Sequence, residues 1–121
     1  MRFESDAPDG SRILLDGKAK AGVSPVVALL LAAAACSGAD VTMIMEKMRI
    51  ELTEFSIDAS GVRREEEPRR YLSMHFTFRL RGQGLDEARA RRAVELSLEK
   101  YCSVVASLAK DLPVTYDIDL G

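Results

Sequence analysis

An unbroken apolar run from Val26 to Cys36 is the feature that most limits how this chain can fold. Ser24 and Pro25 precede it and predict a helix start, because serine accepts bonds from free amides and proline fits the first helical position. We expect a helix reaching about Arg49. The apolar run is too short to cross a bilayer core of roughly 30 Å, so a buried helix is favoured. Neighbouring elements must cover its first half on every side.

The rest of the chain offers strands and one more helix to cover that run. Leu72, Met74, Phe76, Phe78 and Leu80 alternate with polar residues, which is typical of a half-buried strand. A strand over 51–62 precedes it, with Thr53, Phe55, Ile57 and Ala59 on one face. The remaining predictions are a hairpin over 1–17, a turn over 63–70, a helix from Asp86 to Lys110 and a last strand over 114–120. The order β-β-α-β-β-α-β indicates one α+β domain over residues 1–121.

Composition excludes several classes of function. The formal net charge of -2 gives no global basic field for nucleic acid or an anionic membrane. Aromatic residues make up only 6%, with no tryptophan, so stacking platforms for bases are not expected. Two cysteines are too few for a secreted disulfide framework, and no signal peptide is evident. We therefore expect a cytoplasmic protein.

Metal and cofactor sites are not predicted. His75 is the only histidine, it falls on the polar side of its strand, and no CxxC or clustered ligand set is present. The sequence Gly82-Gln83-Gly84 lacks the third glycine of a dinucleotide-binding loop and is interpreted as a strand-to-helix turn. Asp117 and Asp119 lie two residues apart on the polar face of a predicted strand, and exposure to solvent explains why both are acidic.

Cys36 and Cys102 are the remaining candidates for chemistry. Each lies on the side of a predicted helix that should be buried. Packing of the two helices could bring the thiols together, and a disulfide requires Cα atoms within roughly 7 Å. The residues alone leave two readings open: a redox pair, or two inert thiols in the core.

Two segments resemble motifs of the OsmC/Ohr family, nearest to its YhfA-like branch. The sequence SPVVALLLAAAACSGADV, from Ser24 to Val41, is similar to the central-helix motif. The sequence RAVELSLEKYCSV, from Arg92 to Val104, resembles the second cysteine motif. Gly17, the turn from Pro68 to Tyr71 and the closing stretch from Thr115 to Ile118 also fit. The resemblance covers nearly the whole chain, although the strand with which family members usually begin is not evident.

The resemblance implies an intertwined α+β homodimer, with two long central helices packed against antiparallel sheets. It also implies a thiol-dependent hydroperoxide reductase that protects against oxidative or osmotic stress. Cys36 would be the peroxidatic thiolate and Cys102 the resolving thiol. The substrate would be an organic or lipid hydroperoxide, and a dithiol of the lipoyl type would be the reductant. No cofactor is implied.

The chain departs from the catalytic members of the family at the start of the first helix. Those members carry a glutamate there, which positions an arginine that activates the thiolate; Val26 and Val27 stand in its place here. We assign no residue to the role of that arginine. An alternative function is therefore a non-enzymatic dimer of the same fold, which binds a hydrophobic small molecule and keeps both thiols as structural groups.

Overall fold

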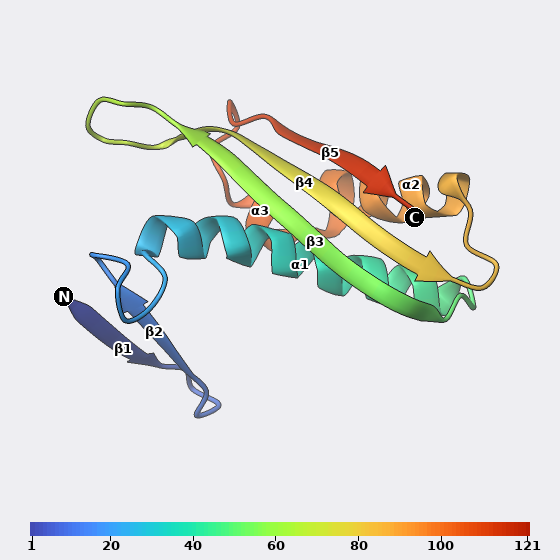
Figure 1. Cartoon of the computed structure of the whole chain (residues 1–121), viewed down its shortest axis with the longest axis horizontal. Coiled ribbons are helices and arrows are strands. Elements are labelled where there is room, and N and C mark those ends of the chain that lie inside the picture. The colour runs from blue at the N-terminus through green and yellow to red at the C-terminus, as the bar shows by residue number, and fades with distance from the viewer.

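The computed structural model describes all 121 residues (Figure 1). Its elements are β1 (Arg2–Asp6), β2 (Arg12–Asp16), α1 (Pro25–Lys47), β3 (Leu52–Arg63), β4 (Tyr71–Gly82), α2 (Glu87–Leu96), a π-helical turn η1 (Ser97–Tyr101), α3 (Ser103–Ala106) and β5 (Val114–Asp119). β1 and β2 form a separate hairpin, and the other strands form a sheet in the order β3-β4-β5. The predicted α+β class and order of elements are confirmed.

The three-stranded sheet turns one apolar face toward the helices. β3 and β4 are antiparallel, with Ile57 opposite Phe78, while β5 runs parallel to β4, with Tyr116 opposite Phe76. The parallel pairing follows from the helical connection between the two strands, which returns the chain to the same end of the sheet. Fully or partly buried residues of this face are Phe55, Ile57, Ala59, Met74, Phe76, Phe78, Leu80, Val114, Tyr116 and Ile118.

Two residues predicted on the buried face of the sheet lie outside it. Shifts in register at the ends of the β3–β4 pair are the cause. At one end Leu52 is partly buried and Thr53 is exposed. At the other end Tyr71 is buried and Leu72 is 47% exposed. The alternation that predicted the strands therefore holds in their middle and fails at these irregularities.

α1 begins as predicted, with the Ser24 hydroxyl accepting a hydrogen bond from the Val27 amide at 3.2 Å. Its buried side packs against β3 and the second helical region, and is made of Leu30, Ala33, Ala34, Ser37, Gly38, Val41 and Met45. Gly38 permits a close approach, because a Cβ there would lie 3.0 Å from Ile57 Cδ1. By length and apolar composition α1 could cross a membrane, but a soluble core helix can have the same properties.

The second helix is not continuous, contrary to the prediction of one helix from Asp86 to Lys110. α2 passes into a π-helical turn, and the chain becomes extended at Cys102, with φ -71° and ψ 106°, before the short α3. The Cys102 amide donates to the Ser97 carbonyl at 2.7 Å and closes the wider turn. Tyr101, predicted on the buried stripe, is consequently 51% exposed, while Ser97 is fully buried. Turns of this kind are rare and are frequent at functional sites.

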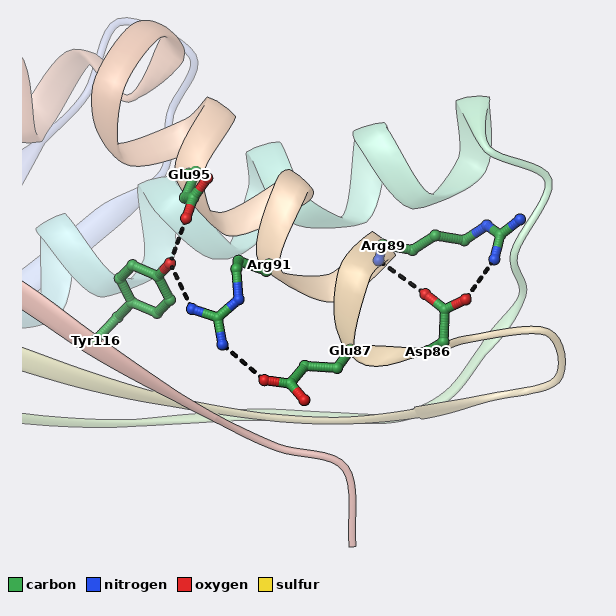
Figure 2. A network of polar contacts seen from close by, with 6 residues as sticks. All are labelled: Asp86, Glu87, Arg89, Arg91, Glu95 and Tyr116. Carbon is green, nitrogen blue, oxygen red and sulfur yellow. Dashed lines mark hydrogen bonds and ion pairs between the residues drawn. The ribbon is translucent and has the colours of Figure 1, made fainter.

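A polar network fixes α2 against β5 (Figure 2). The Tyr116 hydroxyl donates to Glu95 at 2.8 Å and accepts a bond from Arg91 at 3.4 Å. Arg91 also pairs with Glu87 at 2.6 Å, one helical turn earlier. At the start of α2, the Asp86 carboxylate accepts from the Arg89 amide at 2.8 Å and so caps the helix. These contacts hold the helix that leads directly into the π turn.

The β1–β2 hairpin lies beyond the first turn of α1, away from the three-stranded sheet (Figure 1). It confirms the hairpin predicted over 1–17, with Phe3 opposite Leu15. Few of its side chains are covered: Phe3 is 60% and Ile13 52% exposed. The exposed side of α1 also carries large apolar residues, namely Val27, Leu29, Leu31 and Met43. The first half of α1 is therefore not covered on all sides within one chain.

Candidate functional site

The fold brings Cys36 and Cys102 together. Cys36 lies in the middle of α1, and Cys102 lies at the break between the π turn and α3. Their sulfur atoms lie within 4.8 Å of each other, although neither thiol forms a disulfide. The close packing of α1 on the π turn and α3 creates this pair. The fold therefore makes the two thiols neighbours, whereas the S–S bond of a disulfide is only about 2 Å long.

The two thiols differ in exposure. Cys36 is partly exposed, whereas Cys102 is 3% exposed. The Cys102 sulfur accepts a hydrogen bond from the Val105 amide at 3.5 Å and lies 4.0 Å from the Ala33 carbonyl. Burial raises the pKa of the Cys102 thiol to about 11; the Val105 amide opposes this rise and the neighbouring Cys36 adds to it. Cys102 is therefore a protonated, enclosed thiol at neutral pH, and Cys36 is the more accessible of the two.

A carboxylate joins the thiol pair, which the sequence analysis missed. Asp40 lies one helical turn after Cys36 on α1, and one of its oxygens lies within 4.8 Å of both sulfurs. The expectation that no clustered ligand set exists is therefore wrong. The predicted helical face could have placed Asp40 beside Cys36, but only the tertiary fold places Cys102 beside both.

Two buried serines orient this carboxylate. The Ser97 hydroxyl lies 2.8 Å from Asp40 Oδ2 and 2.9 Å from Ser37 Oγ. A carboxylate only accepts and a hydroxyl carries one proton, so Ser97 donates to Asp40 and accepts from Ser37. Both serines are completely buried, and neither was predicted as a site residue. The π turn brings Ser97 to this position, which gives the irregular helix a direct role in building the site.

No side chain of lysine, arginine or histidine hydrogen-bonds to either sulfur, and the Cys102 sulfur contacts the backbone of Val105 and Ala33. Val26, at the start of α1, packs against the core, and its carbonyl accepts from the Tyr71 hydroxyl at 2.9 Å. Arg70, close to that position, is paired with Asp111 at 3.0 Å. The single chain thus holds the thiols near a carboxylate and without a cationic partner.

Two apolar hollows have volumes of about 330 Å³ each, and one of them borders a thiol. One is bordered by Cys102 and is lined mainly by the apolar side chains of Leu98, Val105, Ala106, Leu108, Leu112 and Val114. The other lies at the start of α1 and includes Val26, Tyr71 and the arginine pair Arg69 and Arg70. They share residues of the segment that follows α3. An alkyl group of modest size would fit against either surface.

His75 lies away from the thiols, as predicted from its place on the polar side of β4. Its ring nitrogens contact Thr115 at 2.6 Å and Asp117 at 3.1 Å, both on β5. It belongs to the outer face of the sheet and carries no part of the site.

The molecule is thus a small α+β protein in which two helical segments hold a buried thiol beside a partly exposed one. A model of the family described as "OsmC-like protein" matches residues 16–117. The chain therefore belongs to the OsmC/Ohr family, as its motifs predict.

Relatives of known sequence or structure agree with this assignment. The chain is 35% identical over 121 residues to Protein YhfA of Escherichia coli, covering 99% of this chain and 90% of the relative. The crystal structure of a hypothetical protein from Aquifex aeolicus is 32% identical, with a TM-score of 0.83 over 98% of this chain and 87% of that one. The organic hydroperoxide resistance protein OhrB of Bacillus subtilis shares the fold, with a TM-score of 0.63 at 16% identity, covering 98% and 96% of the two chains.

Proposed function

We propose that this protein reduces organic hydroperoxides with its two thiols, and so protects the cell against oxidative or osmotic stress. The observation that carries the proposal is the approach of the Cys36 and Cys102 sulfurs to within 4.8 Å, with one thiol accessible and the other enclosed. The family includes a protein named for organic hydroperoxide resistance, OhrB, whose fold this chain shares. We place the protein in the cytoplasm, where thiols are kept reduced.

The roles of the two cysteines follow from their exposure. The Cys36 thiolate attacks the outer oxygen of a hydroperoxide R–O–O–H; the O–O bond breaks, Cys36 becomes a sulfenic acid and R–OH leaves after taking up a proton. The Cys102 sulfur then attacks the Cys36 sulfur, and water leaves as the disulfide forms. Attack by Cys102 requires loss of its proton, and the hydroxide that leaves Cys36 takes up that proton. A dithiol reductant of the lipoyl type restores both thiols and is itself oxidised to a disulfide.

The surroundings of the pair favour an organic substrate. The hollow beside Cys102 is lined mainly by aliphatic side chains and has a volume of about 330 Å³. Burying an alkyl group there is worth roughly 0.8 kcal/mol for each CH₂. An alkyl or lipid hydroperoxide gains this energy, whereas hydrogen peroxide gains none of it.

The test is turnover of cumene hydroperoxide by the reduced protein with a lipoyl dithiol as reductant. We expect wild type to consume the hydroperoxide, and Cys36→Ser to be inactive. Cys102→Ser should oxidise once to the sulfenic acid without forming a disulfide within the chain. Ser103→Ala is a matched control, because this exposed residue directly follows Cys102 and its side chain does not hydrogen-bond to either thiol. Wild type no faster than Cys36→Ser would refute the enzymatic function.

We propose that the active form is a homodimer. Only 19 of the 121 residues are buried within one chain, a small core for a domain of this size. Many of the uncovered apolar residues lie on two elements that are neighbours in sequence, the β1–β2 hairpin and α1, and these include Phe3, Ile13, Leu29 and Leu31. A second copy would cover them in a symmetric interface. Light scattering of wild type should give twice the mass of one chain. The substitution Leu29→Glu should shift the measured mass toward that of one chain. A stable wild-type monomer at micromolar concentration would exclude the dimer.

A second function is favoured by the mainly apolar hollow that borders Cys102. The same dimer would bind a hydrophobic small molecule and keep both thiols reduced. Native mass spectrometry of the purified protein distinguishes the two functions: a retained hydrophobic ligand with slow oxidation of both thiols supports binding alone.

A further inference from the structure

We propose that Cys36, Cys102 and Asp40 form a binding site for a thiophilic divalent cation, of which Zn²⁺ is the best match. One donor atom from each of the three residues lies within 4.8 Å of the other two. The donors are two sulfurs and a carboxylate oxygen, all of which are common ligands of zinc.

The spacing suits a tetrahedral ion. Zinc binds sulfur at about 2.3 Å, so two sulfurs on a tetrahedral ion lie about 3.8 Å apart. Donors within 4.8 Å would reach that geometry by approaching one another by about 1 Å. Cys36 and Asp40 are one turn apart on the same face of α1, which is a regular way to present two ligands on a helix.

The carboxylate is already oriented by hydrogen bonding. Ser97, fully buried, donates to Asp40 Oδ2 at 2.8 Å and is itself held by Ser37. The same Ser97 carbonyl accepts from the Cys102 amide at 2.7 Å, so one residue fixes the backbone of one ligand and the side chain of another. Partners of this kind set the direction of metal ligands and commonly change affinity by about 10- to 100-fold when removed.

The charges of the three side chains also favour a divalent cation. Two thiolates and a carboxylate at this spacing would repel one another, and no lysine, arginine or histidine bonds to the sulfurs. Asp40 has Ser97, a neutral group, as its hydrogen-bond partner. A divalent cation would neutralise two of the three charges and allow both thiols to ionise.

The set has three protein ligands, which is the number found in zinc sites with an open fourth position. Cys36 is partly exposed, so water or a small ligand can complete the coordination from its side. A bound ion would occupy the Cys36 sulfur and protect it from hydroperoxide. That consequence rests on the proposed function, whereas the binding itself does not.

The experiment uses the full chain, reduced and freed of metal with a chelator that is then removed. Zn²⁺ is added in competition with a chromophoric chelator, and Cd²⁺ in a parallel titration followed by its thiolate charge-transfer absorbance. We expect about one ion per chain at micromolar affinity or tighter, with the absorbance of two thiolate ligands. Asp40→Asn should weaken binding by about tenfold or more, and Ser97→Ala by about tenfold.

Asp58→Asn is the matched control, since it makes the same charge change on the exposed outer face of the sheet and should leave the affinity unchanged. Circular dichroism checks that each variant is folded. A second measurement needs no variant: wild type oxidised to the Cys36–Cys102 disulfide should lose binding. Failure of the reduced wild type to bind Zn²⁺ or Cd²⁺, or equal affinity in wild type and a folded Asp40→Asn variant, would overturn the site.

The outcomes separate this site from the proposed function. If the protein forms the disulfide with hydroperoxide but binds no metal, the metal site is refuted and the enzymatic function is supported. If the protein binds metal but does not react with hydroperoxide, the metal site is supported and the enzymatic function is refuted.

Discussion

The Ser97 hydroxyl donates to the Asp40 carboxylate across 2.8 Å, and this bond joins the π turn to the central helix beside both cysteines. Ser97 also accepts from Ser37, and both serines are completely buried. The bond therefore links local helix geometry to the position of the thiol pair. It is also costly to break, because an unsatisfied polar group would remain in the interior.

Ser97→Ala should lower the free energy of unfolding by about 1–3 kcal/mol, since Ser37 and Asp40 each lose a partner. Urea denaturation of the reduced protein measures this change. Ser107→Ala is the control, because its exposed hydroxyl bonds only to the Ser103 carbonyl at 2.8 Å. Equal stability of the two variants would mean that the buried network does not hold the turn.

Gly38→Val should destabilise the protein by about 1–3 kcal/mol, because extra methyl groups would press against β3. Even a Cβ added at Gly38 would lie only 3.0 Å from Ile57 Cδ1. Ala88→Val, on the exposed side of α2, controls for the lower helix propensity of valine. The same urea denaturation compares the two variants. If Gly38→Val lowers the free energy of unfolding no more than Ala88→Val does, the close packing of α1 on the sheet is contradicted.

The rate at which Cys102 is alkylated should keep rising up to strongly alkaline pH. Burial raises the pKa of this thiol from 9.0 to about 11, so the thiolate appears later than in an ordinary cysteine. The measurement is the pH profile of iodoacetamide labelling in Cys36→Ser, which leaves Cys102 as the only thiol. The same variant unfolded in urea should show an ordinary profile. A folded profile that levels off near 9.0 would show that Cys102 is not enclosed.

Much of the fold could be predicted because its signals are local. The Ser24-Pro25 pair marks the start of α1, and the alternation from Met74 to Leu80 marks the buried face of β4. These patterns act through backbone capping and through the two-residue repeat of a strand. They fail only where the pairing of β3 and β4 shifts, as at Leu72.

The details of the site could not be predicted in the same way. Residues 86–110 have helical periodicity throughout, and no local sequence pattern predicts a π turn at Ser97–Tyr101. That turn is held by tertiary contacts of Ser97, which exist only once α1 is in place. Helical spacing predicts that Asp40 lies beside Cys36, but its hydrogen-bond partner Ser97 comes from a segment far along the chain. Each cysteine could be recognised by its motif, but their approach depends on packing of the whole domain.

The most direct test of the thiol mechanism is the mass of the reduced, metal-free protein after one equivalent of cumene hydroperoxide. The account predicts loss of two hydrogens and a single peptide cross-link between Cys36 and Cys102, with none in Cys36→Ser. Both thiols still reduced, or oxidation of Cys36 alone without the cross-link, would contradict a redox pair at this site.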